Sequence, residues 1–154
     1  MKKNISRRDG LKLGIAMGVS AFTGTSIAAD KKSYSKISES AGREIWDDIH
    51  GGKGSVPTKR FGFDGAMQPA NFLTYDFPPG ASEGIHTHIL NDENAGSFDE
   101  FYYVVSGVGQ MEIDGEIVPI KEGDHVFTPI GVSHGIENTS EKENLKVFLT
   151  FILR

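Results

Sequence analysis

Two histidines separated by one residue, His86 and His88, are the first side chains in the sequence whose types and spacing suggest chemistry. They lie in a stretch that reads as a β-strand, so both imidazoles are expected on the same face of that strand. Neutral imidazole is the commonest side-chain metal ligand, and two of them on one face can bind the same ion. The pair therefore indicates a metal site, with two surface histidines on an edge strand as the alternative.

The residues around this pair extend the pattern into a longer motif. Gly80 precedes His86 with five residues between them, and Gly107 follows Glu100 with six residues between them. The first of two spaced motifs in the chain therefore consists of Gly80, the two histidines, Glu100 and Gly107.

The second motif lies further along the chain. It begins at Gly123, continues after five residues with Pro129-Ile130-Gly131, and ends with His134 and Asn138. Taken together, the two motifs resemble the two signatures of the cupin family. The resemblance covers residues 70–153.

This resemblance implies an all-β fold, namely a double-stranded β-helix, or jelly-roll, barrel that holds one metal ion inside. In that family the ligands would be the residues numbered here His86, His88, Glu100 and His134. The implied cofactor is one divalent transition-metal ion, and Fe, Mn, Ni, Cu and Zn all suit three imidazoles and a carboxylate. The sequence contains no cysteine, which excludes thiolate ligands, a disulfide scaffold and a cysteine nucleophile.

The position of the carboxylate departs from the family pattern. The family usually places its glutamate four or five residues after the second histidine, whereas Glu100 follows His88 by twelve residues. Glu93 lies at the usual distance and is the alternative ligand. We prefer Glu100, because Gly107 follows it at the family's offset and because it begins an apolar strand. The intervening residues, 89–99, are expected to form a long loop over the mouth of the barrel.

A six-coordinate ion held by four protein ligands keeps two positions for other molecules. Three neutral imidazoles and one ionised carboxylate leave a divalent ion with a net charge of about +1, which favours anionic or readily ionised oxygen ligands. This charge indicates a small anionic or hydroxylated organic molecule as the substrate or ligand. The resemblance to small cupin dioxygenases implies a metal-dependent oxidoreductase as the first expectation. The alternatives are a non-catalytic cupin that binds metal or a small ligand, and a metal-dependent isomerase, lyase or decarboxylase acting on a small sugar or acid.

The two remaining histidines have structural interpretations. Apolar residues recur at every fourth position in residues 37–49 and are followed by Gly51-Gly52, which predicts a short N-terminal helix. His50 would lie in the last turn of this helix, where an imidazole interacts favourably with the helix dipole. His125 matches no ligand of the family and is expected to be partly exposed and non-functional.

From residue 59 onward, short strands are separated by glycine and proline turns, which predicts an all-β barrel or sandwich. The Asp114-Gly115 pair between two alternating runs predicts a two-residue hairpin. The predicted strands cover residues 61–63, 71–77, 84–88, 100–106, 110–113, 116–120, 125–128, 133–138 and 145–153.

Residues 1–29 predict an export signal. They contain a basic head, then an uncharged stretch that ends in small residues, which are the parts of a secretory signal peptide. The paired arginines Arg7 and Arg8 resemble those of a twin-arginine signal, which implies a bacterial protein that is exported after folding and works in the periplasm or outside the cell. The predicted organisation is a signal peptide over 1–29, an N-terminal extension with a short helix over 30–58, and a cupin barrel over 59–154.

The charge balance limits the partners of the chain. Its 16 Lys and Arg residues against 21 Asp and Glu residues give a net charge of −5, so the sequence offers no basic surface for nucleic acid. No membrane contact is expected once the signal peptide has been cleaved. The expected partners are a small-molecule ligand or substrate and the export machinery, with a homodimer as a further candidate arrangement.

Overall fold

The computed structural model describes residues 36, 38–61, 70–93 and 96–154, and these residues form an almost entirely β-stranded fold. The predicted export signal over 1–29 and most of the predicted strand over 61–63 lie outside the described residues. In the described part of the chain, no helix is long and apolar enough to cross a membrane. The all-β fold class expected from the sequence is confirmed.

From residue 70 onward, the strands follow the predicted positions closely. The strands are β1 (Glu44–Asp47), β2 (Ser55–Phe61), β3 (Ala70–Phe77), β4 (Ser82–Thr87), β5 (Phe98–Ser106), β6 (Val108–Ile113), β7 (Glu116–Lys121), β8 (His125–Thr128), β9 (Ser133–Asn138) and β10 (Leu145–Leu153).

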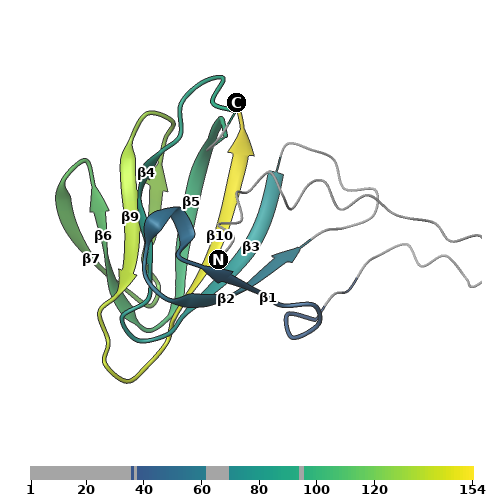
Figure 1. The fold of residues 1–154 in the computed structure, drawn as a ribbon, viewed down its shortest axis with the longest axis vertical. Helices are drawn as coiled ribbons and strands as arrows, with labels where there is room; N and C mark the ends of the chain where they lie inside the picture. Colours follow the sequence, from purple (N-terminus) through teal and green to yellow (C-terminus); the bar gives the residue numbers. More distant parts are fainter. Residues whose placement is uncertain (1–35, 37, 62–69, 94–95) are drawn as a thin grey trace, which may run out of the picture.

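These strands form two antiparallel sheets, which make the two layers of a jelly-roll barrel (Figure 1). One sheet has six strands in the order β1-β2-β3-β10-β5-β8, and the other has four strands in the order β4-β9-β6-β7. β10, the last strand along the chain, lies inside the six-stranded sheet between β3 and β5.

Strand β10 shows how the alternating pattern builds the core. Its residues Leu145, Val147, Leu149 and Phe151 are buried, and the residues between them are half-buried or exposed. Successive side chains of a strand point to opposite faces, so the buried set shares the inner face of the sheet. Together with buried residues of the other sheet, such as Met111, this set forms the hydrophobic core between the layers.

Strands β6 and β7 form the hairpin that Asp114-Gly115 predicts. Both turn residues have positive φ angles, 49° at Asp114 and 84° at Gly115, and the flanking residues Ile113 and Glu116 are paired. Positive φ at both central positions is the geometry of the type I′ turn, for which Asp-Gly is among the preferred pairs.

The short N-terminal helix predicted over 37–49 is wrong. Glu44–Asp47 form the strand β1, which pairs with β2 and places Glu44 opposite Thr58. Within the described residues, the helical structure is a single 3₁₀ turn, η2 (Ile49–Gly51).

Tertiary packing explains why this segment is a strand. The rings of Trp46 and Tyr75 meet edge-on with 5.9 Å between centroids, and the Arg60 guanidinium lies over Trp46 at 5.3 Å. Ile45, which the helical pattern assigned to an apolar face, is 56% exposed. A helix of roughly ten residues has little stability of its own, so packing and strand pairing decide the local structure. The boundary expected at residue 59 consequently falls within β2.

Candidate metal centre

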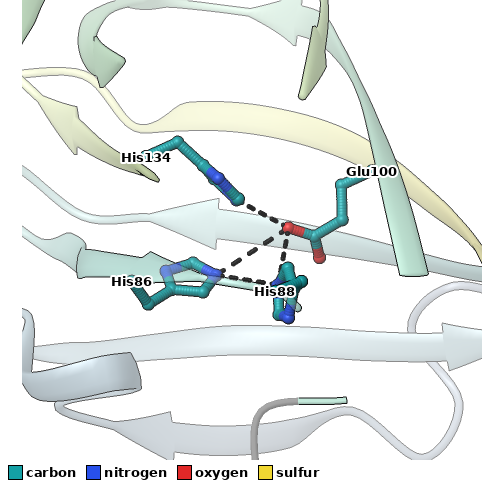
Figure 2. A group of neighbouring side chains, drawn as sticks. All are labelled: His86, His88, Glu100 and His134. Carbon is teal, nitrogen blue, oxygen red and sulfur yellow. Dashed lines mark hydrogen bonds and ion pairs between the residues drawn. The ribbon is translucent and has the colours of Figure 1, made fainter. Parts of the chain in front are cut away.

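The four side chains expected as ligands meet in the interior of the protein (Figure 2). His86 lies on β4, His88 follows β4 directly, Glu100 lies on β5, and His134 lies on β9. His86 and His134 are cross-strand partners in the four-stranded sheet, whereas Glu100 comes from the six-stranded sheet. We call these four residues the convergent set, which joins the two layers of the barrel.

The Oε2 atom of Glu100 is the common point of the convergent set. It lies 2.8 Å from His134 Nε2, 3.2 Å from His88 Nε2 and 3.8 Å from His86 Nε2. The Nε2 atoms of His86 and His88 are 3.1 Å apart, so the two histidines share one face as expected. An ion with bonds of about 2.1 Å places neighbouring ligand atoms roughly 3.0–3.4 Å apart. The spacing of the four donor atoms therefore fits a shared metal ion.

Backbone carbonyl groups hold the outer nitrogens of two of these rings. His86 Nδ1 lies 2.9 Å from Gly84 O, and His134 Nδ1 lies 3.0 Å from Val132 O. Because a carbonyl oxygen only accepts, each Nδ1 carries a hydrogen, and the Nε2 of each neutral ring presents a lone pair to the convergent set. Histidines that bind metal ions are commonly oriented by such a bond on their other nitrogen.

Burial favours a cation at this point. Glu100 is fully buried, and His88 and His134 are 2% and 1% exposed. A carboxylate and several nitrogen lone pairs in close contact repel one another unless a proton or a metal ion lies between them. A proton satisfies two donor atoms, whereas one metal ion can satisfy all four.

The pKa of His134 reflects the same attraction for a cation. Burial by itself lowers this pKa, but the hydrogen bond to Glu100 and the negative charge of Glu100 outweigh it, so the pKa is raised above its ordinary value. A protonated His134 and an ionised Glu100 would form a buried ion pair at 2.8 Å. A metal ion bound by His134 Nε2 would therefore compete with protons for this nitrogen atom.

Glu100, not Glu93, supplies the carboxylate of the convergent set. Glu93 is exposed, and it does not belong to any cluster of potential metal ligands found in the described residues. The loop expected over 89–99 is shorter than predicted, because β5 already begins at Phe98. The Phe98 ring is buried and packs on the His88 ring with 4.0 Å between centroids, so it supports the His88 side chain from inside the barrel.

His50, which the sequence places at a helix end, lies against the convergent set. Its ring is parallel to the ring of His86, with 3.8 Å between centroids and 11° between planes. His50, Glu83 and His86 form a second group of potential ligand atoms, all within 4.8 Å of one another. We call this group the stacked set. Sequence reasoning missed His50 because its position depends on the pairing of β1 with β2.

Two glycines let the turn that carries His50 lie directly on β4. A Cβ atom on Gly84 would lie 2.2 Å from the carbonyl oxygen of His50, and a Cβ atom on Gly52 would lie 2.1 Å from a backbone oxygen of β4. Backbone hydrogen bonds between Lys53 and Ser82, of 3.2 and 2.9 Å, join the two segments in both directions. A side chain at position 84 would push His50 away from the convergent set.

Glu83 is a second buried carboxyl group, and strict strand alternation does not predict it. Because His86 points inward, residue 83 is expected to point outward. However, the pairing of β4 with β9 shifts by one residue between Glu83 and His86, so Glu83 lies opposite the buried Ile136. This β-bulge turns Glu83 into the barrel, where it is 2% exposed.

Tyr102 connects the two carboxyl groups. Its hydroxyl oxygen lies 2.9 Å from Glu100 Oε2 and 3.3 Å from Glu83 Oε2. A phenol carries one hydrogen, so it donates to one carboxylate at a time, and the shorter distance favours Glu100. The Tyr75 hydroxyl contacts Glu83 at 3.5 Å, and His50 Nε2 lies 3.8 Å from Glu83. These contacts form a polar chain from His50 through Glu83 to the convergent set.

His125 lies apart from both sets. It is exposed on β8 and is paired with Tyr103, which is also exposed. It belongs to neither the convergent nor the stacked set, which are the clusters found in the described residues. This position agrees with the exposed location expected from the sequence.

Known proteins resemble the chain in sequence and in fold. The profile of the cupin domain family matches residues 73–151. The chain is 39% identical over 98 residues to an oxalate-binding protein of Thermotoga maritima, and the match covers 62% of this chain and 75% of that protein. The crystal structure of a predicted oxalate decarboxylase from Thermotoga maritima has a TM-score of 0.68 and 34% identity, covering 78% of this chain and 100% of that one. An RmlC-like cupin from Shewanella frigidimarina has a TM-score of 0.55 and 25% identity, covering 77% and 90% of the two chains.

The family match spans the part of the chain that builds the site. It runs from within β3 to within β10 and includes all four members of the convergent set. The sequence motifs, the jelly-roll topology and the family profile therefore agree. The chain belongs to the cupin family.

Proposed function

We propose that this cupin binds one divalent transition-metal ion through the convergent set, and that the ion holds a small carboxylate of the oxalate class. The observation that supports the metal most strongly is the meeting of four buried donor atoms from both sheets, with three imidazole nitrogens 2.8–3.8 Å from Glu100 Oε2. The relative named as an oxalate-binding protein supports a small carboxylate as the bound molecule. When bound, the ion would supply a Lewis-acid position for oxygen ligands.

The charge of the site favours an anion. Three neutral imidazoles and the Glu100 carboxylate leave a bound divalent ion with a charge of about +1. A small dicarboxylate compensates this charge and can bind through two oxygen atoms at once. The attraction is strong because the site is buried and little water screens it.

Calorimetric titration of oxalate tests this function directly. Protein stripped by a chelator should not bind oxalate, and protein reloaded with Mn²⁺ should bind one oxalate per chain. His134→Ala removes a member of the convergent set and should abolish binding, whereas His125→Ala removes an exposed histidine and should leave it unchanged. Equal oxalate binding by stripped and reloaded protein would contradict the proposal.

A second candidate function is metal-dependent decarboxylation of the same class of acid. The related structure described as a predicted oxalate decarboxylase favours it, and so does the second buried carboxyl group, Glu83. Decarboxylation of hydrogen oxalate breaks the carbon–carbon bond, releases CO₂ and places the hydrogen on the carbon that leaves as formate. A binding protein needs no proton donor beside its ligand, whereas an enzyme of this kind does.

The two functions differ in their products. Mn²⁺-loaded protein that decarboxylates should release formate and CO₂ from oxalate in equal amounts. Glu83→Gln should then retain oxalate affinity and lose turnover. Wild-type protein that binds oxalate and releases no formate would decide for the binding function.

The dioxygenase-like activity that the sequence favours ranks behind these two. The convergent set can hold iron, copper or nickel, which such chemistry uses. The matches from Thermotoga maritima are named for oxalate and not as oxygenases, however. Oxygen consumption by iron-loaded protein with a catechol-like substrate would favour dioxygenase activity over oxalate binding and decarboxylation.

We also propose that the chain is exported after folding, on the basis of residues 1–29. Replacing Arg7 and Arg8 together with lysine should leave an uncleaved precursor in the cytoplasm. Normal secretion of this double variant would rule out the twin-arginine route while leaving a general signal peptide in place.

A further inference from the structure

Thr128 is a buried polar residue that lies next to the convergent set. It is the last residue of β8, is 1% exposed, and is paired with Glu100 of β5. Directly opposed residues of an antiparallel pair point to the same face, with Cβ atoms roughly 4.5–5.5 Å apart. The Thr128 side chain therefore borders the same part of the barrel interior as the Glu100 side chain.

The hydroxyl oxygen of Thr128 is buried and has no hydrogen-bond partner among the described residues. Such a hydroxyl is unfavourable, because it has given up its bonds to water without replacement. Valine has the same shape and also favours strands, so packing alone does not require a hydroxyl here. Thr58 provides the contrast, because its equally buried hydroxyl donates to Val56 O at 3.2 Å. The unmet hydrogen bond of Thr128 points to a ligand.

The backbone on the C-terminal side of Thr128 is held in place from two directions. Ile130 N donates to Asp99 Oδ1 at 2.9 Å, and Gly131 N donates to His88 O at 2.7 Å. These bonds tie the end of β8 to β5 and to the segment that follows β4. The Thr128 side chain is therefore positioned in advance, which lowers the entropic cost of binding a ligand.

We propose that Thr128 is a ligand-contacting residue, whose hydroxyl group donates a hydrogen bond to an oxygen atom of the carboxylate held beside Glu100. This proposal rests on the proposed function, since it requires an anion bound at the convergent set. A carboxylate oxygen has more than one lone pair, so an anion that binds the ion can still accept a hydrogen bond. The nearby Tyr102 hydroxyl already donates its hydrogen to Glu100, whereas the Thr128 hydroxyl can donate to the ligand.

Titration of oxalate into Mn²⁺-loaded wild type, Thr128→Val and Thr128→Ser tests the proposal. Thr128→Val should weaken oxalate binding about tenfold or more, because a hydrogen bond to a charged group is lost, and Thr128→Ser should stay within about threefold of wild type. The affinity for Mn²⁺ should be the same in all three proteins. The melting temperature of ligand-free Thr128→Val should equal or exceed that of wild type, since the variant removes an unsatisfied hydroxyl.

Thr58→Val is the matched control, because it removes a buried hydroxyl that has a backbone partner. It should melt at a lower temperature and bind oxalate normally. Wild-type oxalate affinity in Thr128→Val, or a lower melting temperature of its ligand-free form, would overturn the proposal. Should that variant not fold, Thr128→Ala removes the same hydroxyl and is judged by the same oxalate affinity. A wild-type protein that binds Mn²⁺ but no oxalate would instead refute the proposed function.

Discussion

The convergent set and the stacked set share His86, and one of them is far better arranged for an ion than the other. In the convergent set, three imidazole nitrogens lie 2.8–3.8 Å from one carboxylate oxygen of Glu100. In the stacked set, the His50 and His86 rings lie face to face at 3.8 Å with 11° between their planes. The donor atoms are close together in both sets.

Ring orientation separates the two sets. The lone pair of an imidazole nitrogen lies in the plane of its ring, so two stacked rings direct their lone pairs within two nearly parallel planes. An ion between their nitrogens would lie well outside both ring planes. Rings that converge direct their lone pairs at one point. Closeness of donor atoms is therefore not sufficient for a metal site, and we assign His50 the role of holding the His86 ring in place.

Loss of a member of the convergent set should have the largest predicted effect, which is a loss of metal affinity. We expect His134→Ala or Glu100→Gln to lower metal affinity by at least roughly 100-fold, since loss of a mere supporting partner of a metal ligand already costs about 10–100-fold. Metal should also cease to raise the melting temperature. Titration with Mn²⁺ or Zn²⁺ measures the affinity, and His125→Ala is the control. Full metal occupancy in His134→Ala together with loss in His125→Ala would show that the convergent set is misassigned.

Tyr102→Phe removes the hydroxyl that connects the two sets. It should have the next largest effect, which is a loss of stability. We expect the free energy of unfolding of the metal-free protein to fall by about 1–3 kcal/mol, because the buried Glu100 carboxyl group loses its hydroxyl donor and the nearby Glu83 loses a polar neighbour. Urea denaturation measures this change. Tyr75→Phe is the control, because its hydroxyl contacts Glu83 at the longer distance of 3.5 Å and should matter less. Equal losses in the two variants would mean that the bond to Glu100 contributes nothing of its own.

Removal of His50 should have a smaller effect on metal binding. Stacked rings contribute about 0.5–1.5 kcal/mol beyond their buried area, so His50→Ala should lower metal affinity about tenfold or less. His50→Phe keeps a flat ring against His86 and should recover most of this loss. A loss as large as that of His134→Ala, without recovery in His50→Phe, would mean that the stacked set binds the ion.

A change of pH should shift the melting temperatures of the metal-free and the metal-loaded protein in opposite directions. This is the smallest of the four predicted effects. Because the pKa of His134 is raised, its protonated form stabilises the metal-free fold below the ordinary histidine pKa, and this contribution is lost as the pH rises through the raised value. The metal-loaded protein should respond in the opposite direction, because protons displace the ion at low pH. Melting temperatures between about pH 5 and pH 8 should therefore change with opposite slopes. Parallel slopes would contradict competition between proton and ion at His134.

The strands from residue 70 onward can be predicted because local pattern and tertiary packing agree there. In β10 the apolar residues alternate from Leu145 to Phe151, and the structure buries the same set. Asp114-Gly115 can be predicted as a turn from its residue types alone, because this pair favours the positive φ angles that the structure shows. Within the convergent set, strand alternation alone predicts that His86 and His88 share a face. Glu100 and His134 are predicted instead by the resemblance of the two spaced motifs to the cupin signatures.

The stacked set cannot be predicted in this way, because it depends on pairings between distant residues. The spacing of apolar residues before His50 also fits a helix, and only contact with β2 selects the strand β1. Glu83 faces inward because of a one-residue shift that strand alternation does not contain. The available sequence signals are Gly52 and Gly84, since a glycine within a strand pattern often marks a bulge or a close backbone approach.

The place of β10 between β3 and β5 has a consequence for the order of events during synthesis. Phe151 pairs with Asn71 on one side and with Glu100 on the other, so β3 and β5 cannot complete their pairing until β10 has been synthesised. A growing chain that stops before Leu145 would expose two open strand edges, one of which carries Glu100. Pairing over such long separations folds slowly and exposes the chain to aggregation. Metal loading should therefore follow the pairing of β10 with both neighbours, and a chaperone that shields these edges would raise the metal content of the protein as well as its yield.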